Sequence, residues 1–160
     1  MTVHVDGLGT YRASPSARMD EILKEVLEAK PDVLLLQEVV VEMYAVLRRR
    51  LPGWKLHRRH DHAEEYFNVT AVRTRPASAG EKSTSYAFPT SNNGRHMLTA
   101  RRDGWAIVNV HAESGRHQEE RDQRVAQLEY MSRMHERDDD KLWVLAGDFN
   151  ARGRGPLLAL

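Results

Sequence analysis

The sequence predicts one α+β domain in which helices cover the outer faces of β-sheets. The first observation is an amphipathic helical segment that lies between two short apolar segments near the N-terminus. The second is a series of five predicted strands between residues 54 and 111 with no helix among them, so helices and strands do not alternate strictly. The third is size, because 160 residues that are 41% hydrophobic suffice for one domain with a buried core.

The N-terminal part carries a strand, a helix and a second strand in succession. Val3 and Val5 alternate with polar residues over residues 2–6, a pattern typical of a strand. The pair Ser14-Pro15 is typical of a helix start, with serine as the N-cap and proline in the first turn. Residues 33–38 begin as a short apolar run, which favours a buried strand. The apolar stripe of the helix consists of Met19, Ile22, Leu23, Val26 and Leu27.

The next elements are a second helix, a series of strands and a third helix. Residues 43–51 show helical spacing and stop at Pro52-Gly53. The third helix is predicted over about residues 118–134, with Val125, Leu128 and Met131 directed inward. The strands are predicted at residues 54–57, 66–73, 81–88, 96–101 and 105–111. His57, His60, Asp61 and His62 are predicted to lie in a solvated loop.

A final strand begins at Leu142 and leads into polar residues that are candidates for a site. Its apolar run, followed by Gly147, fits a strand that is buried on both faces. Side chains alternate along an extended chain, so Asp148 and Asn150 are expected to point in the same direction and Phe149 in the opposite one. The sequence therefore predicts a carboxylate and a carboxamide side by side at the end of a sheet.

Composition excludes some classes of function and leaves others open. There are no cysteines, which excludes disulfides and thiolate chemistry. The net charge of +1 gives no global field for nucleic acid, although local arginine clusters such as Arg48-Arg49-Arg50 are able to bind phosphates. No apolar run is long enough to span a bilayer and no signal peptide is evident, so we expect an intracellular, cytoplasmic protein without membrane contact.

Polar side chains follow several predicted strands. They are His4 with Asp6, Glu38, His111 with Ser114, and Asp148 with Asn150. Carboxylates that gather at strand ends repel one another unless a cation is present. With no cysteine available, hard oxygen ligands point to Mg²⁺, or Mn²⁺, and such a site usually serves phosphoryl chemistry.

Three motifs resemble, in order and spacing, those of the endonuclease/exonuclease/phosphatase family. They are Leu36-Gln37-Glu38, His111-x-Glu113-Ser114 and Gly147-Asp148-Phe149-Asn150. Further similar stretches are Val5-Asp6-Gly7-Leu8, Tyr66-Phe67, Phe88-Pro89-Thr90-Ser91 followed by Arg95, and Glu113-Ser114 followed by Arg116. The resemblance extends from the first residues to about Asn150, and the linked set is more specific than any single motif.

The resemblance implies a four-layer α/β sandwich, with two packed sheets flanked by helices, over a single domain at residues 1–160. It also implies Mg²⁺-dependent hydrolysis of a phosphodiester at a DNA end, in the most similar branch one that joins tyrosine to a 5′ end. Glu38 would hold the metal with Asp6 nearby. DNA ends, or another phosphodiester, would be the substrate partner.

The resemblance also implies roles for the remaining candidates. Asp148 would orient and deprotonate the attacking water, and Asn150 would position the water or the phosphate. His111 and Ser114 would donate hydrogen bonds to phosphoryl oxygens. Arg95 and Arg116 would contribute to substrate binding.

Two departures from the family pattern leave alternatives open. The first strand carries His4 where the family has asparagine, and the chain stops at Leu160 before the family's Ser-Asp-His motif. The domain is therefore expected to be incomplete at its C-terminus. One alternative is a catalytically incomplete fragment or pseudoenzyme that only binds metal and nucleic-acid ends. The other is a different branch of the family, an endonuclease or a sugar- or lipid-phosphate phosphatase.

An incomplete sandwich has a consequence for the surface. Each sheet is expected to bury one apolar face against the other sheet. Apolar surface around Val144 and Leu145 is then expected to be partly uncovered, and self-association through this surface is expected.

Overall fold

A computed structural model describes residues 1–9, 12–59, 65–74, 81–102, 104–138 and 142–151. Within these ranges the chain forms three helices and eight strands. They follow in the order β1 (Thr2–His4), α1 (Pro15–Glu28), β2 (Val33–Val39), α2 (Val41–Arg50), β3 (Trp54–Arg58), β4 (Phe67–Arg73), β5 (Lys82–Ala87), β6 (His96–Arg102), β7 (Trp105–His111), α3 (Gln118–Glu136) and β8 (Leu142–Asp148).

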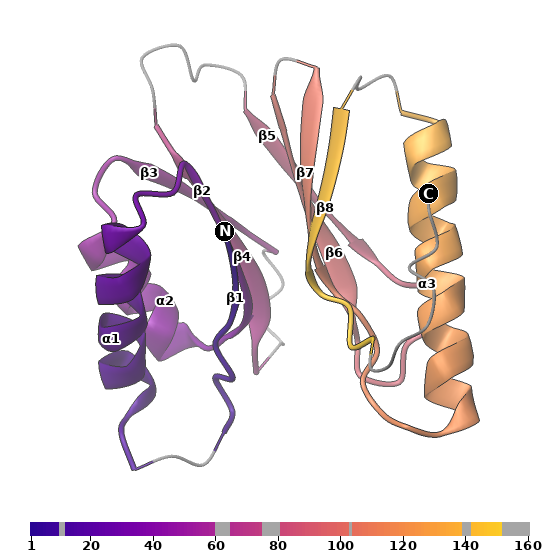
Figure 1. Ribbon diagram of the computed structural model, residues 1–160, viewed down its shortest axis with the longest axis horizontal. Helices are drawn as coiled ribbons and strands as arrows, with labels where there is room; N and C mark the ends of the chain where they lie inside the picture. The colour runs from indigo at the N-terminus through magenta and orange to yellow at the C-terminus, as the bar shows by residue number, and fades with distance from the viewer. Residues whose placement is uncertain (10–11, 60–64, 75–80, 103, 139–141, 152–160) are drawn as a thin grey trace.

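The strands form two sheets of four, which are packed against each other as the predicted sandwich (Figure 1). The first sheet has the order β1-β2-β4-β3 and the second the order β5-β6-β7-β8. Only β1 with β2 and β7 with β8 run parallel within these sheets; the other described pairs are antiparallel. Helices α1 and α2 cover the outer face of the first sheet, and α3 covers that of the second. The four-layer α+β prediction is confirmed.

The two apolar clusters lie between each sheet and its own helices. Met19 and Leu23 of α1 pack with Leu34 and Leu36 of β2, so the outward side chains of the first sheet are apolar. On the other side, Met131 of α3 packs in a cluster with residues of β6, β7 and β8. Each sheet therefore buries its most apolar face under helices, which corrects the expectation that these faces meet each other.

Between the sheets lies a layer that contains buried amides. Gln37 Nε2 of β2 donates to Asn109 Oδ1 of β7 over 2.7 Å. Asn109 Nδ2 donates back to the carbonyl oxygens of Leu36 (3.2 Å) and Val69 (3.0 Å) on the first sheet. Both amides are at most 1% exposed, and buried amides of this kind are stable only when their hydrogen bonds are made. These bonds fix how the two sheets sit relative to each other.

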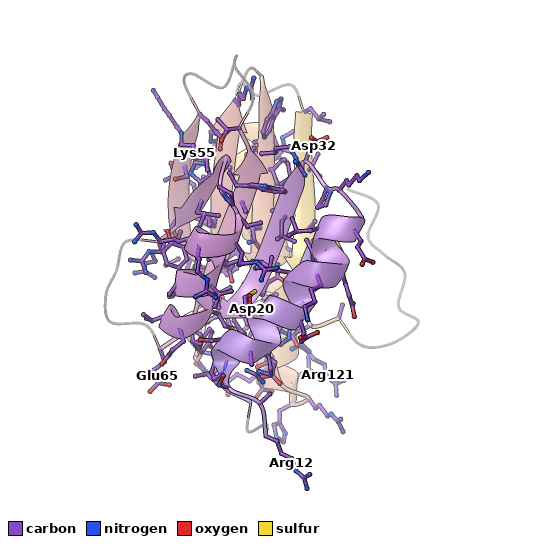
Figure 2. All side chains as sticks on the ribbon, turned by 90° about the vertical axis from the view of Figure 1, so that its left-hand side faces the viewer. Arg12, Asp20, Asp32, Lys55, Glu65 and Arg121 are labelled. Atoms are coloured by element: carbon purple, nitrogen blue, oxygen red, sulfur yellow. The ribbon has the colours of Figure 1, made fainter. Side chains whose placement is uncertain are left out.

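Charged residues join the two helices that cover the first sheet. Asp20 of α1, labelled in Figure 2, accepts from Arg49 Nη2 over 3.3 Å and from Arg50 Nη1 over 3.0 Å, both on α2. Part of the arginine cluster that was considered for phosphate binding is thus paired with a carboxylate. Among the described residues, no helix is long and apolar enough to cross a membrane.

Two predicted placements are wrong. Val125 was expected to point inward but is 49% exposed, and Gln127 is fully buried instead because it bonds to the main chain at Glu113 and Thr90. His57 lies at the end of the strand predicted over residues 54–57, but it is not solvated as expected: it is buried in β3 and paired with the Glu81 carboxylate. The other members of that histidine cluster lie outside the described residues.

Strand β8 forms one edge of the second sheet and is poorly covered. Leu142 is 57% exposed and Val144 is 44% exposed, whereas Leu145 packs against the cluster beneath α3. The expected uncovered surface is therefore present around Val144, on the side of β8 that faces away from α3.

We expect the 160-residue chain to self-associate through this edge, because exposed apolar residues favour association and, within the described residues, β8 pairs on one side with β7 and on the other with no strand. Light scattering after size-exclusion chromatography measures the solution mass. Val144→Lys places a charge on the edge and should return the chain to the monomer, with Val125→Lys on α3 as the matched control. A monomeric parent chain at high concentration would contradict this prediction.

Candidate active site

Four candidate residues meet at one end of the layer between the sheets. His4 ends β1, and Glu38 lies one residue beyond the position that pairs with it on β2. His111 ends β7 and is paired in register with Asp148, which ends β8. Parallel neighbours bring their carboxyl ends to the same sheet edge. Each sheet thus contributes one parallel pair, and the two pairs face each other.

The donor atoms of these residues converge. Glu38 Oε1 lies 3.4 Å from His4 Nε2 and 3.6 Å from His111 Nε2. Asp148 Oδ2 lies 3.8 Å from His4 Nε2 and 4.0 Å from His111 Nε2. One atom each from His4, Glu38 and His111 falls within 4.8 Å of the others, a spacing that suits a bound cation.

The two histidines have opposite electrostatic environments. A hydrogen bond to Glu38, together with the charges of Glu38, Asp148 and Asp6, raises the pKa of His4 despite its partial burial. Burial, followed by the charge of Arg95, lowers the pKa of His111 to about 3. His111 is therefore a neutral imidazole at physiological pH, whereas His4 gains a proton more readily and then sits as a cation between two carboxylates.

Arg95 lies beside both His111 and Glu38, and its Nη1 is 3.7 Å from Glu38 Oε1. Its Nη1 is 2.8 Å from His111 Nδ1, and its Nη2 donates to Ser114 Oγ over 3.1 Å. The guanidinium carbon is 5.5 Å from the centre of the Tyr66 ring, within the range of a cation–π contact. Tyr66, Arg95, His96 and His111 line part of a cavity of about 190 Å³. This cavity gives a small ligand access to His111.

Glu113 belongs to the His111-x-Glu113-Ser114 motif but is not among the predicted site residues. It is fully buried and accepts hydrogen bonds from Ser91 Oγ (2.6 Å) and from the Asn93 side chain. Burial alone raises a carboxyl pKa, but these bonds outweigh burial and lower the pKa of Glu113. Ser91 Oγ in turn accepts from Arg95 N over 2.8 Å. The carboxylate thus holds the loop that carries Arg95, and the recurrence of Ser91, Arg95 and Glu113 in the quoted motifs is the sequence signal from which this role could have been inferred.

Three more residues were predicted to belong to the site, and the structure places them differently from the four that converge. They are Asp6, Asn150 and Arg116. Asp6 is near enough for its charge to act on His4, but it is not in the converging group. Asn150 does not continue the strand: its side chain donates to Ala112 O over 3.0 Å and its main-chain N to Asp148 Oδ1 over 2.8 Å. Arg116 lines a separate groove beside α3, with Asn150.

The backbone at the site is strained. Among the described residues, the non-glycine residues with positive φ are Asp6 (47°), Glu38 (62°), Asn150 (49°) and one remote lysine, Lys30 (50°). The left-handed region costs free energy for such residues and persists where the surrounding structure enforces it. At Glu38 the enforcing contact is the bond from Gly7 N to the Glu38 carbonyl oxygen, at 2.9 Å. This backbone conformation directs the Glu38 side chain out of the strand, so that its carboxylate lies beside His4 and His111.

We expect acid to destabilise the fold through two buried histidines. Burial, followed by the charge of Arg59, lowers the pKa of His96 to about 4, and His111 is lowered to about 3. Between these values and 6.5 the unfolded chain binds more protons than the folded chain, so stability is full above pH 6.5 and falls as the pH falls. The loss at pH 5 should be on the order of 2 kcal/mol for each histidine.

Urea unfolding at pH 7.5 and pH 5 measures this loss. His96→Gln should remove about half of the pH dependence. The exposed His117, replaced by glutamine, is the matched control and should keep the parental dependence. Equal unfolding midpoints of the parent chain at the two pH values would contradict the prediction.

Comparisons with known proteins agree with this geometry. The sequence model of the Endonuclease/Exonuclease/phosphatase family matches residues 5–158. Tyrosyl-DNA phosphodiesterase 2 of Homo sapiens is 28% identical over 160 residues, which cover 96% of this chain and 42% of the human protein. A humanized D. rerio TDP2 is 25% identical with a TM-score of 0.76, covering 94% of this chain and 61% of that one. D. rerio TDP2 in complex with a single-strand DNA product, at 24% identity, also has a TM-score of 0.76, over 95% of this chain and 60% of that one. The chain thus spans less than two thirds of the length of these relatives.

Proposed function

The chain belongs to the endonuclease/exonuclease/phosphatase family, and we propose that it is a metal-dependent phosphodiesterase that acts on DNA ends. The observation that carries the proposal is the convergence of Glu38, His4, His111 and Asp148 at one end of the two sheets. Carboxylates and a neutral imidazole beside a buried arginine suit a reaction in which negative charge builds up on phosphoryl oxygens. Enzymatic activity and substrate are both parts of this proposal.

The donor set fits a divalent cation. Glu38 is the residue that would hold the metal, because its Oε1 is the carboxylate atom shared by both histidine contacts. Asp6 and Asp148 add negative charge around it, and hard oxygen ligands favour Mg²⁺, with Mn²⁺ as a close substitute. When bound, the cation would neutralise charge on the phosphate.

The remaining roles follow from residue chemistry. Asp148 has an acceptor-only carboxylate that is partly open to solvent, as a base that takes a proton from water requires. Asn150 fixes this carboxylate through its main-chain N–H. His111 and Ser114 would donate to phosphoryl oxygens, and Ser114 Oγ already accepts from Arg95, so its own O–H is available as a donor.

A tyrosyl adduct at a 5′ DNA end is the substrate that we propose. The human relative is named as a tyrosyl-DNA phosphodiesterase, and a D. rerio relative has a structure with a single-strand DNA product. The aromatic ring of Tyr66 and the guanidinium of Arg95 lie together beside His111, and such a pair suits an aromatic leaving group.

An oligonucleotide that carries a 5′-phosphotyrosyl end tests the proposal. Release of tyrosine with Mg²⁺, and none with EDTA, is the expected result. Binding of the oligonucleotide without turnover would support the alternative of a chain that only holds metal and nucleic-acid ends. Absence of both binding and turnover would overturn the proposal.

Metal binding should depend on Glu38. Glu38→Gln keeps the shape of the side chain and removes the charge that a hard cation requires, so Mg²⁺ and Mn²⁺ affinity should fall at least about tenfold. Calorimetric titration of each ion measures this affinity. Glu42→Gln, at an exposed glutamate in the first turn of α2, is the matched control and should bind as the parent does. Unchanged affinity in Glu38→Gln would remove Glu38 from the site.

A further inference from the structure

The contact between Arg95 and His111 determines which ring nitrogen of His111 carries the proton. Arg95 Nη1 and His111 Nδ1 are 2.8 Å apart. A guanidinium has only N–H donors and no acceptor, and it stays charged at every working pH. His111 Nδ1 must therefore accept this hydrogen bond with its lone pair. A ring whose Nδ1 keeps its lone pair carries its single N–H proton on Nε2.

The Nε2 atom is the ring nitrogen that lies near the two carboxylates of the site. It lies 3.6 Å from Glu38 Oε1 and 4.0 Å from Asp148 Oδ2. An Nε2 that carries a proton donates hydrogen bonds and has no lone pair for a cation. His111 is thus a donor toward the centre of the site, although its position among the converging atoms also suits a metal ligand.

Arg95 is itself held in one position from several sides. The residue is 6% exposed, and its Nη2 donates to Ser114 Oγ over 3.1 Å. Its main-chain N donates to Ser91 Oγ over 2.8 Å, and Ser91 donates to the buried Glu113 carboxylate over 2.6 Å. The arginine therefore has little freedom to release Nδ1.

We propose that Arg95 is a positioning residue that fixes His111 in the Nε2–H form, as a hydrogen-bond donor to an anionic oxygen of the substrate and not as a metal ligand. The identity of that oxygen as a phosphoryl oxygen rests on the proposed function. The assignment of the tautomer rests on the Arg95 contact alone. One consequence is that a cation at this site would be held by Glu38 and neighbouring oxygens without His111, a donor set that suits Mg²⁺ better than Zn²⁺.

The tautomer is measured directly on the whole chain, without substrate, by long-range ¹H–¹⁵N correlation spectra of ¹⁵N-histidine-labelled protein. His111→Gln identifies the resonances of this residue. We expect the parent chain to show only the Nε2–H form at pH 7.5, unchanged when one equivalent of Zn²⁺ is added. Arg95→Met removes the donor and should shift His111 to a mixture of the two forms, which then responds to Zn²⁺.

Two further variants separate positioning from general structural damage. Arg95→Lys keeps a charged donor and should retain more of the Nε2–H form than Arg95→Met does. Arg73→Met removes an arginine that stacks on Trp54, far along the sequence from His111, and should leave the spectrum of His111 unchanged. An Nδ1–H form in the parent chain, or the same single form in the parent and in Arg95→Met, would overturn the proposal. If Arg95→Met does not fold, the parent and Arg95→Lys spectra still decide it.

Inorganic phosphate is the anion probe that separates this proposal from the proposed function. Binding of phosphate in the presence of Mg²⁺ should move the His111 Nε2–H resonance, because that proton then bonds to an anionic oxygen. If phosphate binds to the parent chain and the His111 Nε2–H resonance does not move, the donor role is overturned. A chain that shows the expected tautomer and phosphate response but no hydrolysis would refute the proposed function and leave the role of Arg95 intact.

Discussion

Replacing Asp148 with asparagine should reduce hydrolysis by about a hundredfold to ten-thousandfold, the range that general bases contribute. Asparagine keeps the shape of the side chain, and its oxygen is still able to accept from Asn150 N, a bond of 2.8 Å in the parent chain. What is lost is the ability to take a proton from water. Single-turnover hydrolysis of a 5′-phosphotyrosyl oligonucleotide measures the effect.

Nucleic-acid affinity provides the control within the same variant. It should be kept within a few-fold, because affinity for DNA comes mainly from arginine–phosphate contacts that are screened by salt. Asp122→Asn, at an exposed aspartate of α3, should change neither affinity nor rate. Turnover at the parental rate in Asp148→Asn would mean that another group is the base.

Replacing Gly147 with alanine should destabilise the fold by about 2 to 6 kcal/mol, a large share of the stability of an ordinary domain. Two effects add. Gly147 has φ of 143°, a conformation that a residue with a Cβ rarely adopts. A Cβ at this position would also overlap the carbonyl oxygen of Val110 on the neighbouring strand β7. Because Gly147 precedes Asp148, the displaced strand would carry the Asp148 carboxylate with it.

Gly53→Ala separates the two effects. Gly53 also has positive φ (79°), but a Cβ there meets nothing within 4 Å. This variant should lose only the conformational part, roughly 1 kcal/mol, in urea unfolding. Equal losses in Gly147→Ala and Gly53→Ala would show that close packing of β8 on β7 is not the cause.

Most of the fold could be predicted from local patterns. The helix after Ser14 begins at Pro15, and Ser14 Oγ accepts from Ala17 N as an N-cap should. The strand that begins at Val33 and the helix that ends before Pro52 also match. These elements are specified by near neighbours in the sequence, so the sequence alone suffices to locate them.

The failures come from contacts between distant residues. Val125 fits the apolar stripe of α3, but Gln127 takes the buried position because the main chain at Glu113 and Thr90 needs a partner there. His57 looks like part of a polar loop, yet the buried Glu81 pairs with it. Neither partner is near in sequence, and periodicity carries no information about it.

The site shows the same division. Residue type and strand ends identified Glu38, His111 and Asp148. The turn of Asn150 toward Ala112 was not foreseen, because alternation along a strand applies only while the backbone stays extended, and Asn150 has φ of 49°. The shielding of His111 Nδ1 by Arg95 likewise depends on a contact that only the folded chain creates.

The hydrogen bond between the buried amides of Gln37 and Asn109 forms a bridge between the sheets. This bridge also limits where residues are inserted or deleted in the chain during evolution. Gln37 and Asn109 meet across the two sheets, and Glu38 and His111 follow them by one and two residues. One residue inserted between Gln37 and Glu38, or one inserted or deleted between Asn109 and His111, would change the direction in which Glu38 or His111 points relative to this bridge. Insertions at the other end of the sandwich, such as the turn at Gly53 between α2 and β3, do not change this count, and lengthening a loop costs little. We expect relatives to differ in length at such turns while both intervals stay constant, so that new loops are acquired without displacing Glu38 and His111.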